Sequence, residues 1–349
     1  MSLPIGYGYE PMEALSVAEL PVGPAWQYEP KWDGFRCIAF RDGAKVELRS
    51  KAGRSLSRYF PEVVAALSAF GAKRFVLDGE LVVRGDGALS FDALLQRIHP
   101  AATRVTRLAA ETPALYVVFD LLVDSTGKSL VNEPLDERRS RLEKFSARYI
   151  AGAAGVRLSP YSSSLRTARG WLAGRAGLDG VVAKRVDLPY ESGERTGMQK
   201  VKRIRTADCV VGGFRYASRG GGVGSLLLGL YNDEGLLDHI GFTSSFSAEE
   251  RRALLPRVEK LIRPPGFSGK KPGGPSRWST ARSSEWQPLA PRLVVEVTYD
   301  HFSGDRFRHG TGFVRWRPDK APRQCTMEQV IQPAPSVMRL LGGGKRKKG

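Results

Sequence analysis

The feature that most constrains the fold of this chain is a change in sequence pattern near Arg205. Before Arg205, strand-like segments alternate with segments of helical periodicity, whereas from Ala207 onward short strand-like segments are separated by glycine-rich turns. A chain of 349 residues also exceeds the usual size of one domain. We therefore predict a first domain over residues 1–205, a second over residues 206–335 and a basic flexible tail over residues 336–349.

The first domain is predicted to mix strands and helices. The segments "FRCIAFRDGAKVELRS" and "RFVLDGELVVRGDGALSF" carry Asp-Gly pairs at residues 42–43 and 86–87, between strand-like runs, which is typical of β-hairpins. The run "ALYVVFDLLV" is almost entirely apolar, as expected of a strand covered on both faces. This mixture predicts an α/β or α+β domain. Helical patterns predict helices over residues 61–70, 91–98, 135–145 and 167–176.

The second domain is predicted to be mainly β. Short strands are indicated by "ADCVVGGFRY", "GSLLLGLYNDEGLLDHIGF" and "RLVVEVTYDHFS", and one helix begins at Ser247, with Glu250 at capping-box spacing. About five strands and one helix in this length fit a small barrel of the OB type. Residues 263–286 are predicted to form a long irregular loop.

The charge of the chain indicates a polyanionic partner. The formal net charge is +18 and the sequence pI is about 10.0, and cations placed on phosphates release condensed counterions. An arginine-rich proteome would give the same surplus, so charge alone leaves both interpretations open. The chain shows neither a secretory leader nor an apolar run long enough for a membrane span, so we expect a cytoplasmic protein with no membrane partner. Its three widely spaced cysteines are expected to be buried thiols.

Three short stretches place charged side chains two residues apart, where a strand directs both to one face. Charges beside apolar strand residues are costly unless they are paired or bind a ligand. Convergent lysines would hold a polyphosphate and carboxylates would share Mg²⁺ with it, so the pattern indicates phosphoryl or nucleotidyl transfer. The pairs are Lys31 with Asp33, Asp78 with Glu80, and Lys200 with Lys202, and the carboxylates available to the metal are those of Asp33, Glu80 and Asp179.

Lys31 is the candidate nucleophile of such a reaction. A free lysine has a pKa near ~10.4 and must lose its proton before it can attack. Partial burial and nearby cations such as Lys200 and Lys202 are expected to lower this pKa, whereas Asp33 alone would raise it. Taken alone, "KWDG" is short, and a lysine on a surface hairpin is the competing interpretation.

The order of seven short motifs carries more information than any one of them. The chain contains "KWDGFR", "RSKAG", "LDGEL", "VVFD", "LDGVVAKR", "QKVKR" and "RWRPDK", in this order, between residues 31 and 320. They resemble motif I, the following hairpin motif and motifs III, IIIa, IV, V and VI of the covalent nucleotidyltransferase superfamily. The chain is most similar to ATP-dependent DNA ligases, and among these to the stand-alone bacterial LigC group. The resemblance implies an α+β nucleotidyltransferase (adenylation) domain with antiparallel sheets and flanking helices, followed by an OB-fold β-barrel domain.

The resemblance also implies roles for single residues. Lys31 matches the lysine that attacks the α-phosphate of ATP and becomes AMP-lysine. Glu29 matches the position that reads the adenine amino group, and Phe119 the aromatic that stacks on adenine. Arg36 matches the position that holds the ribose, and Glu80 the carboxylate that serves ribose and metal.

A set of cations is implied to bind the nucleotide phosphates. Lys184, Lys200 and Lys202 resemble those that hold the α-phosphate, with Arg195 as a further candidate. Lys51 belongs to the hairpin motif. Arg317 and Lys320 resemble residues of the barrel domain that orient the pyrophosphate leaving group.

Three positions depart from the pattern of the family. Lys51 stands where many ligases have arginine, which retains the charge and loses the bidentate fork. Asp179 replaces the more usual glutamate of motif IV, so its reach toward a metal is one methylene shorter. Met198 occupies the place of a frequent tryptophan.

The implied activity is that of an ATP- and Mg²⁺-dependent DNA ligase. It would act as a monomer on nicked double-stranded DNA, in DNA repair, in the bacterial cytoplasm and on the nucleoid when bound to DNA. A hinge near residues 202–206 would let the barrel close over ATP and then turn to DNA, and loop 263–286 is a candidate DNA contact. Repair polymerases or end-binding proteins that would recruit it are not specified by the sequence.

Three alternatives stay open: an mRNA capping guanylyltransferase, an RNA ligase of the same superfamily, and a catalytically idle nucleic-acid-binding protein.

Overall fold

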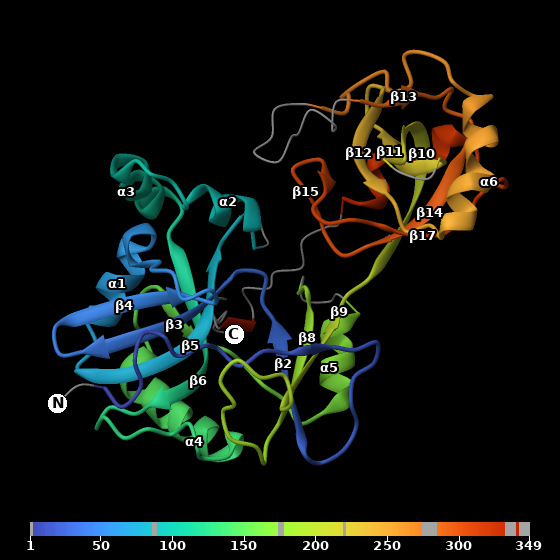
Figure 1. The fold of residues 1–349 in the computed structure, drawn as a ribbon. Helices are drawn as coiled ribbons and strands as arrows, with labels where there is room; N and C mark the ends of the chain where they lie inside the picture. Colours follow the sequence, from blue (N-terminus) through green and yellow to red (C-terminus); the bar gives the residue numbers. More distant parts are fainter. Residues whose placement is uncertain are drawn as a thin grey trace, which may run out of the picture. The chain divides into compact units, whose positions relative to one another are not determined.

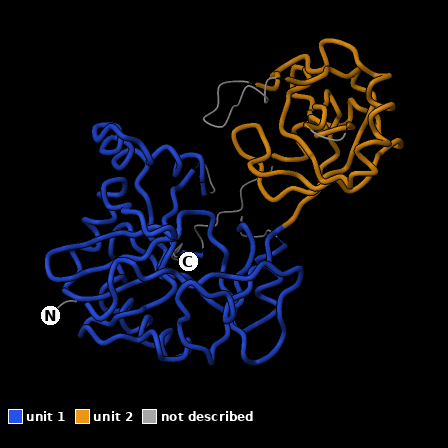
Figure 2. Tube along the Cα trace, in the orientation of Figure 1, with its two compact units in different colours: residues 1–203, 334–349 blue, residues 204–333 orange. Residues whose placement is uncertain are grey.

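The computed structural model describes residues 3–85, 89–173, 178–218, 221–273, 285–331 and 340–341. The chain divides into two compact units, one of residues 1–203 with 334–349 and one of residues 204–333 (Figure 2). The division at residues 203–204 lies beside the change of sequence pattern. Over the described ranges, none of the helices is long and apolar enough to cross a membrane.

A five-stranded sheet forms one layer of the first unit (Figure 1). Its order is β4-β3-β5-β6-β7, and all neighbours are antiparallel except β6 and β7, which are parallel. The predicted hairpin at residues 42–43 is confirmed, since β3 and β4 pair across it. The predicted two-sided strand is also confirmed, because all ten residues of β6 are buried. The strands are β3 (Phe35–Asp42), β4 (Lys45–Ser50), β5 (Arg74–Val83), β6 (Ala114–Val123) and β7 (Val156–Leu158).

A four-stranded sheet of order β1-β9-β8-β2 forms the other layer. The prediction that Lys31 and Asp33 share a strand face is wrong: β2 ends at Lys31, and the chain then crosses to β3 in the five-stranded sheet. The change of sheet breaks the two-residue alternation on which that prediction relied. These strands are β1 (Leu15–Ser16), β2 (Trp26–Lys31), β8 (Gly180–Arg185) and β9 (Met198–Lys202).

Helices α1 and α4 pack on one face of the five-stranded sheet, whereas α5 packs against β2 and β8 of the four-stranded sheet. Val63 and Leu67 of α1 and Leu142 of α4 belong to the same core as the inner residues of β3, β5 and β6. The helix predicted over residues 135–145 is confirmed with both of its ends, the other three predicted helices are present with shifted ends, and α3 was not predicted. The bounds are α1 (Pro61–Ser68), α2 (Phe91–Gln96), α3 (Ala102–Glu111), α4 (Leu135–Phe145) and α5 (Leu165–Leu172), with short turns at Ser57–Tyr59 and Ser146–Ile150.

Besides the end of the helix predicted over residues 167–176, two predictions for the first unit fall partly on residues outside the described ranges. The hairpin turn at residues 86–87 is one, although Arg84 and Leu89 on either side form an antiparallel bridge. The other is the tail over residues 336–349, of which only Leu340 and Leu341 are described. These two leucines pack against the core between the two sheets, and Leu341 is buried, so this part of the predicted flexible tail is packed.

The second unit is built on an antiparallel sheet of order β12-β11-β10-β14-β17. A parallel bridge from Thr243, at the end of β12, to Thr311, just before β17, brings the two edges of the sheet toward closure, as expected of an OB-type unit. The predicted helix and its capping box are confirmed: Ser247 and Glu250 each accept a hydrogen bond from the other's backbone N–H. The main elements are β10 (Arg205–Tyr216), β11 (Val223–Tyr231), β12 (Leu237–Thr243), α6 (Ala248–Glu259), β14 (Val294–Tyr299) and β17 (Gly312–Trp316).

Smaller elements complete the second unit. β13 (Gln287–Pro288) pairs with β10, while β15 (Phe302–Ser303) and β16 (Arg306–Phe307) pair with each other. Single helical turns lie at Pro322–Gln324 and Met327–Gln329. Residues 263–273 and 285–286 of the predicted loop have no regular structure, and its middle lies outside the described residues. The three cysteines are buried and free, as predicted.

Candidate active site

A cavity of about 500 Å³ lies in the first unit and is lined by both of its sheets. β2, β8 and β9 contribute to it from one sheet, and β3, β5 and β6 from the other. Gly34, in the crossing between the sheets, also lines it, and a side chain there would collide with the Leu81 carbonyl oxygen of β5. This explains the glycine of "KWDG". The predicted site residues that line the cavity are Glu29, Lys31, Arg36, Lys51, Glu80, Phe119, Lys184 and Lys200.

Lys31 stands at the end of β2 with its Nζ donating a hydrogen bond to Asp179 Oδ2. The Asp179 carboxylate is buried, and the Lys31 side chain is 21% exposed. Burial lowers the pKa of Lys31, but Asp179, followed by Glu80 and Asp33, outweighs burial and raises that pKa above its ordinary value. The expected lowering of the Lys31 pKa by Lys200 and Lys202 is therefore wrong for the site without nucleotide, because a direct ion pair is stronger than more distant repulsion.

Glu80 on β5 faces Lys31 and Arg36. Burial raises the pKa of its carboxyl to about 7, although the neighbouring cations Arg36 and Lys31 act in the opposite direction. A nearby cation would stabilise the charged form of the buried Glu80 carboxylate, so this residue fits a Mg²⁺ ion in the cavity.

The carboxylates of the cavity suit a metal ion that is bound partly by substrate phosphates, and not a metal ion that is bound by protein side chains alone. Asp33, Glu80 and Asp179 all raise the pKa of Lys31, so each of the three carboxylates lies near enough to interact with its amine. Within the described part of the chain, however, no group of three or more His, Cys, Asp or Glu is arranged to hold a metal ion. Mg²⁺ commonly takes one or two carboxylates and completes its shell with water and substrate phosphates, so these residues fit the ion only together with a nucleotide.

Phe119 on β6 is flanked by two cations. The Arg36 guanidinium carbon lies 4.6 Å from the ring centroid, and Lys184 Nζ lies 4.4 Å from it. Arg36 is fixed by a bidentate pair with the fully buried Asp78, at 2.7 Å from Nε to Oδ1 and 2.6 Å from Nη2 to Oδ2. The predicted adenine and ribose residues therefore lie together in the cavity.

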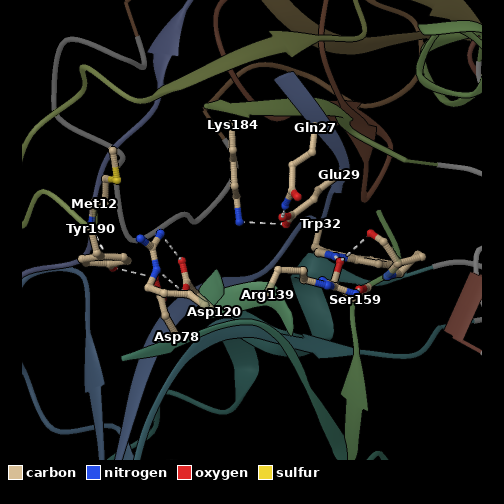
Figure 3. Close-up of polar contacts among 12 residues, drawn as sticks. Met12, Gln27, Glu29, Trp32, Asp78, Asp120, Arg139, Ser159, Lys184 and Tyr190 are labelled. Atoms are coloured by element: carbon tan, nitrogen blue, oxygen red, sulfur yellow. Dashed lines mark hydrogen bonds and ion pairs between the residues drawn. The ribbon is translucent and has the colours of Figure 1, made fainter. Parts of the chain in front are cut away.

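Glu29 and Lys184 form a buried ion pair (Figure 3). Lys184 Nζ lies 2.8 Å from Glu29 Oε2, and Gln27 Nε2 donates to Glu29 Oε1 at 2.9 Å. All three side chains are buried. Lys184, which was predicted to bind the α-phosphate, is thus the ion-pair partner of the residue that was predicted to read adenine.

Glu13 is a cavity residue that the sequence did not reveal. It pairs with Lys51 at 2.6 Å and with Arg195 at 2.8 Å, and these cations and their hydrogen bonds lower its pKa. Lys200 also lines the cavity, and burial followed by the charge of Lys31 lowers its pKa. Arg195 and Lys202 are not among the lining residues, although Lys202 pairs with Gly180 next to Lys31. No motif surrounds Glu13, so no local signal could have identified it.

The predicted pyrophosphate ligands share one carboxylate in the second unit. Asp208 Oδ1 lies 2.8 Å from Arg317 Nη1, and Asp208 Oδ2 lies 2.7 Å from Lys320 Nζ. Arg317 also pairs with the exposed Asp319 at 2.8 Å. Asp208 therefore holds the side chains of Arg317 and Lys320 close to each other.

Two family models match the chain: the ATP dependent DNA ligase domain over residues 12–202 and the ATP dependent DNA ligase C terminal region over residues 219–320. This chain belongs to the ATP-dependent DNA ligase family. The first match contains all the lining residues of the cavity except Pro11, and the second contains Arg317 and Lys320. Because the two matches cover most of both units, the sequence resemblance stated above is confirmed.

Similar proteins place the chain with the LigC group of this family. It is 45% identical to DNA ligase C2 of Mycolicibacterium smegmatis, over 95% of this chain and 97% of that protein. It is 42% identical to DNA ligase C of Mycobacterium tuberculosis, over 95% of this chain and 96% of that protein. A solved Lig E DNA ligase structure has a TM-score of 0.53 at 19% identity, over 88% of this chain and 100% of that one, and supports the fold alone.

Proposed function

We propose that this chain seals nicks between a 5′-phosphate and a 3′-hydroxyl in double-stranded DNA, using ATP. The observation that carries the proposal is that Lys31 lines a cavity together with the cation Lys200 and the aromatic ring of Phe119, with three carboxylates near its amine. Membership of the ligase family and the net charge of +18 support DNA as the substrate.

The proposed reaction has three transfers. Lys31 Nζ, once deprotonated, forms a bond to the α-phosphorus of ATP, and the bond from that phosphorus to its bridging oxygen breaks to release pyrophosphate. AMP then passes from Nζ to the 5′-phosphate of the nick. Finally the 3′-hydroxyl attacks that phosphate, AMP leaves, and the phosphodiester is complete. Covalent catalysis of this kind replaces one difficult condensation by three exchanges.

The chain's own residues provide positioning and charge neutralisation. Phe119 and Arg36 would hold adenine and ribose, Glu29 would read the base, and Lys184, Lys200 and Lys202 would neutralise the α-phosphate, with Lys51 and Arg195 near by. Asp33, Glu80 and Asp179 would hold Mg²⁺, which when bound stabilises charge on the phosphates. We retain Arg317 and Lys320 as proposed ligands of the leaving pyrophosphate.

The lysine nucleophile can be tested directly with nucleotides labelled on the α-phosphate. We expect wild-type protein to become labelled by ATP and Mg²⁺, and to seal a nicked DNA duplex. Lys31→Ala should lose both the label and the sealing activity, because the variant lacks the amine that attacks the α-phosphorus in the proposed reaction. Lys128→Ala is the matched control, since Lys128 is an exposed lysine of the same unit paired with Glu133, and it should behave as wild type.

The same experiment separates the competing functions. Labelling by GTP alone would favour a capping guanylyltransferase, and faster sealing of an RNA nick than of a DNA nick would favour an RNA ligase. Sealing that persists in Lys31→Ala would contradict the covalent mechanism and leave a nucleic-acid-binding protein with a contaminating activity.

The cellular setting is proposed from the family alone. We place the enzyme in the bacterial cytoplasm, as a monomer that joins the nucleoid when it binds DNA, with a function in DNA repair. A strain that lacks the gene should become sensitive to DNA-damaging agents, and unchanged survival would contradict the repair function without affecting the proposed chemistry.

A further inference from the structure

Tyr190 belongs to none of the seven motifs, yet its hydroxyl is part of the buried network beside the cavity (Figure 3). The hydroxyl donates a hydrogen bond to Asp78 Oδ2 at 2.6 Å and accepts one from the Met12 backbone N–H at 2.9 Å. Tyr190 and Met12 are buried, and Asp78 is fully buried. The hydroxyl thus uses both its donor and its acceptor capacity inside the protein.

These contacts close a ring with Arg36. The two oxygens of Asp78 accept hydrogen bonds from Arg36 Nε and Nη2, and Nη2 also donates to the Met12 carbonyl oxygen at 3.3 Å. Tyr190, Asp78, Arg36 and Met12 are therefore joined in one cycle, of which Met12 and Arg36 line the cavity. The cycle connects segments that are up to 178 residues apart in the chain.

We propose that Tyr190 is a positioning residue that holds the Arg36 guanidinium in the orientation that binds ATP. The inference rests on the proposed function of Arg36 at the nucleotide. Without the hydroxyl, Asp78 Oδ2 and the Met12 N–H each lose a buried partner, which is costly in a buried site. Movement of Asp78 or Met12 to find new partners would carry the Arg36 guanidinium away from Phe119.

The packing of the tyrosine ring is separate from the contacts of its hydroxyl. The ring stacks on Tyr9 with centroids 6.0 Å apart, and the Arg138 guanidinium carbon lies 5.5 Å from the Tyr190 centroid. Tyr190→Phe keeps these ring contacts and removes only the hydrogen bonds to Asp78 and Met12. This substitution therefore tests positioning and leaves the core filled.

The test measures the apparent KM for ATP in the adenylation of Lys31 by the full chain. Tyr190→Phe should raise this KM roughly tenfold, because a buried hydrogen bond to a charged group is lost. The rate of adenylation at saturating ATP should stay within about twofold of wild type, because the loss affects binding of the nucleotide and leaves the reacting atoms in place.

Tyr9→Phe is the matched control. The Tyr9 hydroxyl donates only a long bond of 3.5 Å to the Tyr190 carbonyl oxygen, and it contacts neither Asp78 nor Arg36 in the contacts described. Its removal should leave the KM for ATP unchanged. An equal rise of KM in Tyr9→Phe and Tyr190→Phe would mean that any change in this aromatic pair disturbs the site, and would overturn the inference.

A double-mutant cycle with Arg36→Lys decides whether Tyr190 acts through Arg36. Lysine keeps a positive charge for Asp78 and loses the guanidinium fork. Arg36→Lys alone should raise the KM for ATP, and adding Tyr190→Phe should then have little further effect. Equal effects of Tyr190→Phe in both backgrounds would refute the inference, whereas an unchanged KM in Arg36→Lys would refute the proposed function of Arg36.

Discussion

At the scale of single residues, the ion pair of Lys31 Nζ with Asp179 controls whether the Lys31 amine is protonated. The raised pKa of Lys31 keeps the amine protonated, and a protonated amine cannot attack phosphorus. Asp179→Asn removes the main anion that opposes burial, so it should lower the Lys31 pKa. The rate of Lys31 adenylation at saturating ATP and Mg²⁺, followed from about pH 7 to about pH 11.5, across the ordinary lysine pKa of about 10.4, should then rise at a lower pH than in wild type.

The position of the pH profile is the informative quantity in this experiment. Asp179 is also a proposed metal ligand, so the maximal rate is expected to fall, but the midpoint of the profile is independent of that maximum. Asp33→Asn is the comparison, because Asp33 makes the smallest of the three carboxylate contributions to the Lys31 pKa, and it should shift the midpoint less. An unshifted midpoint in Asp179→Asn would show that Asp179 does not control the proton of Lys31.

The residues of the cavity were predictable where they belong to short motifs. Glu29, Lys31 and Arg36 lie within eight residues of one another, so a local sequence pattern marks them. Glu13 and Tyr190 have no such signal, because their partners come from distant segments: the Met12–Tyr190 bond spans 178 residues. The ion pair of Lys31 with Asp179 spans 148 residues, so the direction of the Lys31 pKa shift also required the structure.

At the scale of secondary-structure elements, strong local sequence patterns were sufficient to predict a helix or strand, whereas weak patterns were not. The nine apolar residues among the ten of β6 and the capping box of α6 are visible in the sequence and present in the structure. α3 was missed because no side chain caps its N-terminus and only Val105 is buried among its residues. The crossing from β2 to β3 was missed because nothing local in "KWDGF" distinguishes a change of sheet from a hairpin.

The junction of β10 with the segment after β17 gives a second prediction at this scale. Asp208 on β10 holds Arg317 and Lys320, which follow β17, so one carboxylate orients both proposed pyrophosphate ligands. Asp208→Asn should slow Lys31 adenylation by roughly tenfold or more, since each cation loses a charge-assisted bond and its fixed orientation. Single-turnover labelling with ATP measures this rate.

Asp319→Asn is the matched control for Asp208. Asp319 also pairs with Arg317, but its side chain is 63% exposed, and exposed pairs contribute little. We expect Asp319→Asn to stay within about threefold of wild type. If Asp208→Asn adenylates Lys31 as fast as Asp319→Asn does, the pair between β10 and the segment after β17 is not needed to orient the two cations.

At the scale of the whole molecule, the net charge of +18 predicts that the steps of the reaction differ in their response to salt. Adenylation of Lys31 involves one small nucleotide, whereas sealing requires the enzyme to neutralise several DNA phosphates and release their counterions. An enzyme that contacts about six phosphates should lose roughly a thousandfold in affinity for nicked DNA between about 50 mM and about 200 mM salt. The affinity is measured with nicked and intact duplexes of the same sequence, and Lys31 labelling is followed over the same salt range. Labelling that falls as steeply as DNA binding would show that salt acts on the cavity, and a flat dependence of DNA binding would show that the surplus charge does not act on the DNA backbone.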